Sequence, residues 1–179
     1  MNATSSDRAD APTDGPAKRT AASAARLAAV QALYQMSMTG HGADAVVREF
    51  RLHRFSQPVD EQQAAAADAD PALFGELVRG VATHADELDD MLAAVLSDEL
   101  DVDRLEAVLK TILRAGAFEL SARLDVPAPV AINEYVDVAD AFYARKETAL
   151  VNAVLDRLAR SLRPEELEGH PGESASLTG

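Results

Sequence analysis

Acidic side chains at helical spacing are the first candidates for chemistry in this sequence. The stretch PVAINEYVDVAD, residues 129–140, carries Glu134, Asp137 and Asp140. Such carboxylates can form a catalytic cluster, bind a metal ion, or make up the solvated face of a helix. Di-iron sites in helical bundles need a histidine three residues after a glutamate, and none follows Glu134 at that spacing. We therefore expect a structural role, with no catalysis and no metal site: the acids line a solvated face, except that Asn133 and Glu134 fix the helix start or an interhelical contact.

The other reactive residue types give no support for an enzyme. The four histidines are scattered and do not pair at metal-ligand spacing. The chain has no cysteine, which excludes disulfides, thiolate metal sites and cysteine nucleophiles. It also lacks a phosphate-binding glycine loop and a nucleophile-elbow pattern. We therefore expect a protein that is not an enzyme and that uses no cofactor.

Basic residues near the amino terminus suggest a different chemistry. Lys18, Arg19 and Arg26 lie at or just before the first predicted helix. The formal net charge of −13 argues against a large basic surface. A local basic segment can nevertheless bind phosphates. Three basic residues at a helix start also occur without any ligand, so the residues alone leave this role open.

Helices must position these residues. Ala, Leu and Val dominate the 47 % apolar share, whereas aromatic residues make up only 4 %, which favours helices over strands. The spacing of apolar residues predicts an all-α bundle of six to seven helices. These helices cover about residues 26–40, 42–54, 71–83, 84–97, 103–120, 130–143 and 147–162.

Particular residues predict how some of these helices begin, end and pack. Asp70 stands before a proline, a pairing that favours an N-cap. Asp103 and Glu106 resemble a capping box. Gly40 is a plausible helix stop, whereas Gly116 within a helix predicts the close approach of a neighbouring helix.

Polar segments flank the predicted folded part. Residues 1–17 are expected to form a disordered arm and residues 164–179 a disordered tail, which leaves a helical domain over 18–163. The acidic stretch 56–70 is predicted to be a loop without an assigned function. No apolar run resembles a secretory leader or a membrane span, so we expect a cytoplasmic protein.

Five ordered blocks resemble the NusB family of bacterial transcription antitermination factors. They read AVQALYQ, GVATHADELD, ILRAGAFEL, DVPAPVAINEYVDVADAF and LVNAVLDRLA. The resemblance spans about residues 18–163 and implies a bundle of two packed helical halves. It further implies a non-catalytic factor that binds the boxA sequence of nascent ribosomal RNA transcripts. The implied partners are the small-subunit ribosomal protein NusE and an RNA polymerase antitermination complex.

The resemblance also implies an RNA-binding surface. Its residues would be Lys18, Arg19 and Arg26 from the arm and first helix, with Tyr34, Phe142, Lys146 and Leu150. Single-stranded RNA is commonly bound by stacking on aromatic rings and by phosphate contacts. Two features depart from the family pattern. The segment TAASAA between Arg19 and Arg26 has no charge, and Leu150 stands where well-known members have an aromatic residue.

Two other classes of function remain open. The chain could be a NusB-like accessory module related to the N-terminal domain of ribosomal RNA cytosine methyltransferases. It has no nucleotide-binding glycine pattern, so it could not itself perform that methyl transfer. It could also be a helical scaffold that binds only protein. Some family members self-associate, and the sequence leaves a homodimer open.

Overall fold

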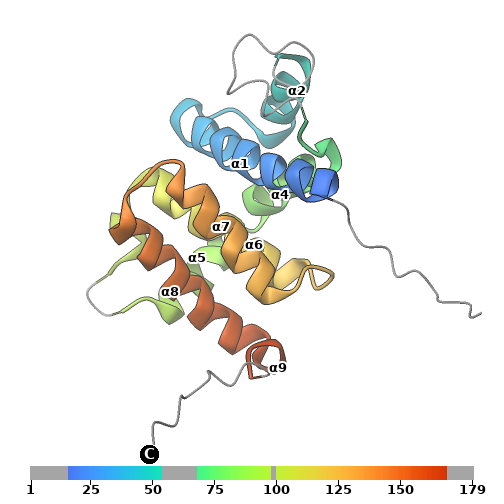
Figure 1. Ribbon diagram of the computed structural model, residues 1–179. Helices are drawn as coiled ribbons and strands as arrows, with labels where there is room; N and C mark the ends of the chain where they lie inside the picture. The colour runs from blue at the N-terminus through green and yellow to red at the C-terminus, as the bar shows by residue number, and fades with distance from the viewer. Residues whose placement is uncertain (1–15, 54–67, 98–99, 169–179) are drawn as a thin grey trace, which may run out of the picture.

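The fold was described in a computed structural model, which places the backbone of residues 16–53, 68–97 and 100–168. Within these ranges the chain forms eight α-helices, one 3-10 helix and no strand, which confirms the predicted all-α class (Figure 1). No helix in them is both long and apolar enough to cross a membrane. The elements are α1 (Pro16–Thr39), α2 (Ala43–His53), α4 (Pro71–Thr83), α5 (Ala85–Val95), η1 (Val102–Arg104), α6 (Ala107–Ala122), α7 (Ala128–Asp140), α8 (Arg145–Leu162) and α9 (Pro164–Leu167).

The helices form two packed halves, as the resemblance implies. Helices α1, α2 and α4 pack on one another, and helices α5 to α9 form the second half (Figure 1). Helix α6 joins the halves because it packs against α1 and α4 on one side and against α7 and α8 on another. Its middle is buried almost continuously, from Thr111 to Leu120 with the exception of Arg114. Any polar group on this part of α6 therefore needs an internal partner.

The predicted helix ends are partly right. The Asp70 carboxylate accepts hydrogen bonds of 2.9 and 3.1 Å from two backbone N–H groups of α4, so it is the N-cap. Gly40 ends α1 in the left-handed region, with φ of 72°. The start of α6 was predicted wrongly. Asp103 belongs to η1, and the helix begins at Ala107 with the Glu106 side chain as its cap.

Glycine allows the close helix packing around α6. A methyl group at Gly116 would lie 2.7 Å from Cδ1 of Leu155 on α8, which confirms the predicted close approach. A methyl group at Gly80 of α4 would overlap the ring of Phe118 on α6. At both glycines a side chain of the neighbouring helix fills the space that a Cβ atom would need. A larger residue would therefore force the helices apart.

Some predicted boundaries differ from the observed ones. Helix α1 begins at Pro16, inside the predicted arm 1–17, and its Ala-rich first turns favour a helix. Helix α9 lies inside the predicted tail 164–179. Its Glu166 carboxylate accepts hydrogen bonds of 2.7 Å from Arg163 and from the backbone N–H of Ala128, and these bonds fix the segment on α7. Residues 1–15 and 169–179, and most of the acidic stretch 56–70, lie outside the described residues.

Candidate nucleic-acid interface

A groove brings together two aromatic residues that the sequence separates widely. It has a volume of about 410 Å³ and lies between the C-terminal half of α1, the start of α6 and the turn between α7 and α8. Tyr34 is half-buried on one wall and Phe142 is 40 % exposed on the other. The residues that line it are Val30, Gln31, Tyr34, Gln35, Met38, Val108 and Phe142. Apolar walls with amide groups beside two rings suit a planar, polar-edged ligand such as a nucleobase.

The turn that carries Phe142 is held at both ends. Helix α7 ends at Asp140, and the N–H groups of residues 141–143 donate to carbonyl groups of its last turn. The Tyr143 hydroxyl donates to the Glu106 carboxylate that caps α6. Thr148 at the start of α8 donates from Oγ1 to Asp140 at 2.9 Å. These bonds fix the backbone of the turn, so Phe142 is presented to the groove without a large ordering cost.

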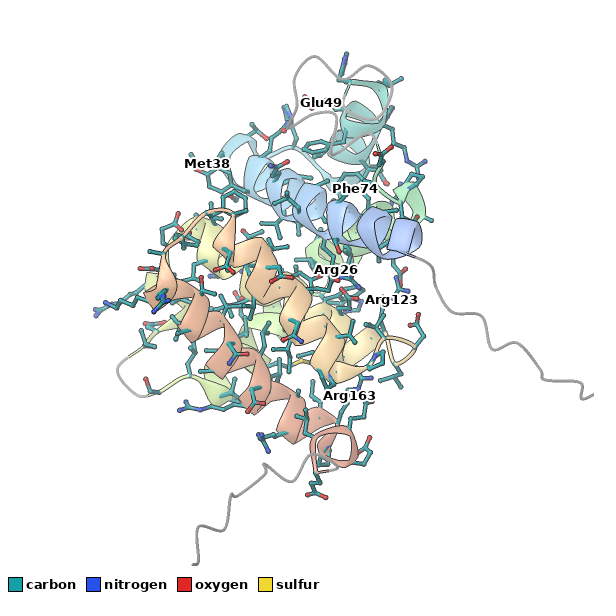
Figure 2. All side chains as sticks on the ribbon, in the orientation of Figure 1. Arg26, Met38, Glu49, Phe74, Arg123 and Arg163 are labelled. Carbon is teal, nitrogen blue, oxygen red and sulfur yellow. The ribbon has the colours of Figure 1, made fainter. Side chains whose placement is uncertain are left out.

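Arg26 does not belong to an RNA surface, which corrects the prediction made for it. Its side chain is only 4 % exposed and lies between the two halves of the bundle (Figure 2). Nε and Nη2 donate to the two carboxylate oxygens of Glu119 on α6 at 3.0 and 2.5 Å. Nη1 lies 3.2 Å from the Glu134 carboxylate on α7. The guanidinium is therefore occupied by internal partners and is not available to a phosphate.

Tyr135 and Ser23 complete a buried network around this arginine. The Tyr135 hydroxyl donates to Glu119 at 2.9 Å, and the Ser23 hydroxyl donates to Glu134 at 2.7 Å. Burial, and then the Glu119 charge, raise the pKa of Tyr135 well above its usual value, so it remains a donor. Burial alone would lower the pKa of Arg26, but the hydrogen bonds and charge of Glu119 outweigh it and raise that pKa. The network therefore joins α1, α6 and α7 with all its charges in place.

The acidic stretch of α7 has a structural role at two of its three positions. Glu134 is half-buried and makes the interhelical contact with Arg26 and Ser23, whereas Asp140 accepts the hydrogen bond from Thr148. Asp137 is exposed. An interhelical contact was one of the two structural roles expected for Glu134, although the local sequence did not show that its partner would be Arg26 on α1. Within the described residues, no group of three or more His, Asp or Glu side chains is placed to hold a metal ion.

With this geometry established, the chain can be compared with known proteins. A family model described as the NusB family matches residues 23–160. The chain belongs to the NusB family. It is 48 % identical over 141 residues to the transcription antitermination protein NusB of Caulobacter vibrioides, across 79 % of this chain and 93 % of that protein. It is 49 % identical over 147 residues to the protein of the same name from Brucella ovis, across 82 % and 85 % of the two chains.

Solved NusB structures share the fold. T. maritima NusB has a TM-score of 0.62 at 24 % identity, over 87 % of this chain and 99 % of that one. A crystal structure of the antitermination factors NusB and NusE in complex with dsRNA has a TM-score of 0.59 at 24 % identity. That alignment covers 78 % of this chain and 96 % of the other. At this identity the likeness bears on the fold, and it agrees with the two-halved NusB-like bundle.

The other RNA-binding residues predicted from the NusB resemblance lie on two separate helices, α8 and the first turn of α1. Lys146 is exposed at the second residue of α8. Leu150 is half-buried one turn further on and packs against the core, outside the lining of the groove. Lys18 and Arg19 belong to the first turn of α1, and their side chains lie outside the described residues. The structure therefore brings Tyr34 and Phe142 together and removes Arg26 from the set.

Three groove residues on α1 were missed by the sequence reasoning. Gln31, Gln35 and Met38 line the groove together with Tyr34. Positions 31, 34, 35 and 38 follow the spacing of one helix face, so the signal was present around the aromatic residue. Met38 lies at the exposed end of this face and is 67 % exposed.

Proposed function

We propose that this chain is a non-catalytic transcription antitermination factor that binds boxA RNA of nascent ribosomal RNA transcripts together with NusE. Family membership carries the proposal, because the relatives it matches over most of their length are antitermination proteins. The groove supplies a place for RNA, since Tyr34 and Phe142 line it with two amide side chains. On this proposal the protein works in the cytoplasm within an RNA polymerase antitermination complex.

The proposed RNA surface has an aromatic part and a basic part. The aromatic part is the groove with Tyr34 and Phe142, where an unpaired base would stack. Lys146, exposed beside the turn, would contact a phosphate, as would Lys18 and Arg19 at the start of α1. Leu150 would add apolar contact only. An accessory module of a methyltransferase is not favoured, because the matched relatives are antitermination proteins.

Replacing both Lys18 and Arg19 by alanine will weaken RNA binding mainly at low salt. Each phosphate contact to a single strand contributes about 0.7 to the slope of log affinity against log salt. The double variant should therefore lose about 1.4 from the slope while remaining folded. Fluorescence anisotropy of a labelled boxA RNA across a salt series measures this slope.

A matched control uses two arginines remote from the proposed surface. Arg157 and Arg160 are exposed on the C-terminal half of α8. Replacing both by alanine removes the same charge and should leave the slope close to that of the unmodified protein. If the unmodified protein and the Lys18/Arg19 variant show equal salt slopes, the first turn of α1 is not part of the RNA-binding surface.

A further inference from the structure

A separate hollow lies between α2 and α4. It has a volume of about 450 Å³, and arginines dominate its lining. The lining residues are Asp44, Val47, Arg48, Arg51, Leu52 and Arg79. We name Arg48, Arg51 and Arg79 the α2–α4 arginine cluster. In the described part of the chain, these three arginines line the hollow with one carboxylate, that of Asp44, although the formal net charge of the protein is −13.

Two of these arginines converge above a glycine. A methyl group on Gly75 of α4 would lie 2.8 Å from Nη1 of Arg79 and 3.8 Å from Nη2 of Arg51. The missing side chain thus leaves room for both guanidinium groups over the same helical position. Arg51 also donates from Nη2 to the carbonyl of Pro71 at 3.2 Å, which directs its side chain across the start of α4. The arrangement places two planar donors close together at the surface.

The nearby acidic residues only partly neutralise this cluster. Asp44 accepts from Nε of Arg79 at 2.7 Å. Glu49 of α2 is bonded instead to Gln35 at 3.1 Å, and Glu76 of α4 lies 3.1 Å from Arg123. Both of these carboxylates have partners outside the hollow. Among the residues that the structure describes, Arg48 takes part in no ion pair, and the described lining of the hollow holds more basic than acidic side chains.

A hydrogen bond between α1 and α2 links the groove to the helix that carries Arg48 and Arg51. Gln35 lines the groove, and its amide donates to Glu49 on α2. Figure 2 shows Glu49 and Met38 at the same end of the molecule, where α2 meets the end of α1. An RNA strand that leaves the groove past Gln35 would therefore reach α2 next.

We propose that the α2–α4 arginine cluster binds the phosphate backbone of RNA that flanks the segment held in the groove. Guanidinium groups form paired, charge-assisted hydrogen bonds with phosphate oxygens, and the groups of Arg51 and Arg79 converge over Gly75. The ligand class is an RNA strand longer than the groove itself can hold. This proposal rests on the proposed function, because it assumes that the groove binds RNA.

The test compares two double variants that remove the same charge. Arg48→Gln with Arg51→Gln changes the cluster, and Arg157→Gln with Arg160→Gln is the matched control. Arg157 resembles Arg51 in donating to a backbone carbonyl, that of Val95 at 3.3 Å. Binding is measured by anisotropy across a salt series, with boxA RNA alone and with boxA RNA extended by flanking nucleotides.

The cluster variant should bind the short RNA as the unmodified protein does and should lose affinity for the extended RNA. For two lost contacts the salt slope with extended RNA should fall by about 1.4. The control variant should change neither slope. Asp44→Asn, which removes the carboxylate paired with Arg79, should bind the extended RNA more tightly than the unmodified protein does.

Each outcome separates this proposal from the function on which it rests. If the unmodified protein binds neither RNA, with or without NusE, the proposed function itself fails. If it binds both and the two double variants behave alike on extended RNA, the cluster proposal alone is overturned. A cluster variant that loses affinity for NusE but keeps its RNA slope would assign the hollow to a protein partner and also overturn it. Asp44→Asn gives an independent readout if the double variant is unstable, because weaker or unchanged binding contradicts the proposal.

Discussion

Replacing Glu119 by alanine will destabilise the protein by about 3–5 kcal/mol, the usual cost of leaving one member of a buried ion pair alone. Glu119 is fully buried and accepts from both Arg26 and Tyr135. Its removal leaves the Arg26 guanidinium with only the half-buried Glu134 as a charged partner. Urea unfolding followed by circular dichroism measures the change in the free energy of unfolding.

Two controls separate the effect of the buried charge from a general effect of losing a glutamate. Glu76→Ala breaks an ion pair with Arg123 at the surface and should cost no more than about 1 kcal/mol. The double variant Arg26→Met with Glu119→Leu should be more stable than Glu119→Ala, because no fully buried charge is then left unpaired and the half-buried Glu134 keeps access to water. A loss below about 1 kcal/mol for Glu119→Ala would show that the network does not hold α1 against α6.

Replacing Phe142 by alanine will weaken RNA binding without unfolding the protein. One base stacked on an aromatic ring contributes about 1–3 kcal/mol, so the dissociation constant should rise about 5- to 150-fold. Phe142 is 40 % exposed on a turn that backbone and side-chain hydrogen bonds hold, so its loss should cost little stability. Anisotropy with boxA RNA measures affinity, and thermal unfolding of the same sample checks the fold.

The control for Phe142 is another exposed apolar residue. Leu124 is 70 % exposed in the turn between α6 and α7, outside the groove, and Leu124→Ala should leave RNA affinity unchanged. Leu150→Phe restores the aromatic residue found in well-known family members and should raise affinity. If Phe142→Ala and Leu124→Ala bind RNA equally well, the groove is not the stacking site.

The sequence predicted the helices well because their signals are local. Asp70 before Pro71 marks a helix start, and Gly40 marks a stop, within a few residues of the chain. The start of α6 was predicted three to four residues early, because either Asp103 or Glu106 has the right side chain for a cap. The choice depends on Tyr143, whose hydroxyl donates to Glu106 from 37 residues away.

The candidate site could not be predicted from local sequence patterns, because it is built from contacts between residues far apart in the chain. Arg26 and Glu119 are 93 residues apart, and the spacing within either helix shows no partner. A signal was nevertheless present, since Arg26 shares a helix face with Ala29, Val30 and Leu33, all of them buried. A charged residue on a face otherwise buried requires an internal partner. Tyr34 and Phe142 came from the family resemblance, and only the fold placed them in one groove.

The most direct test of the central claim is RNA preference measured with and without NusE. Labelled boxA RNA and a scrambled RNA of the same length and composition are titrated with the protein alone and with its mixture with NusE. We expect tighter binding to boxA than to the scrambled RNA, and a larger preference when NusE is present. Equal binding to the two RNAs, both by the protein alone and by the mixture, would contradict the account.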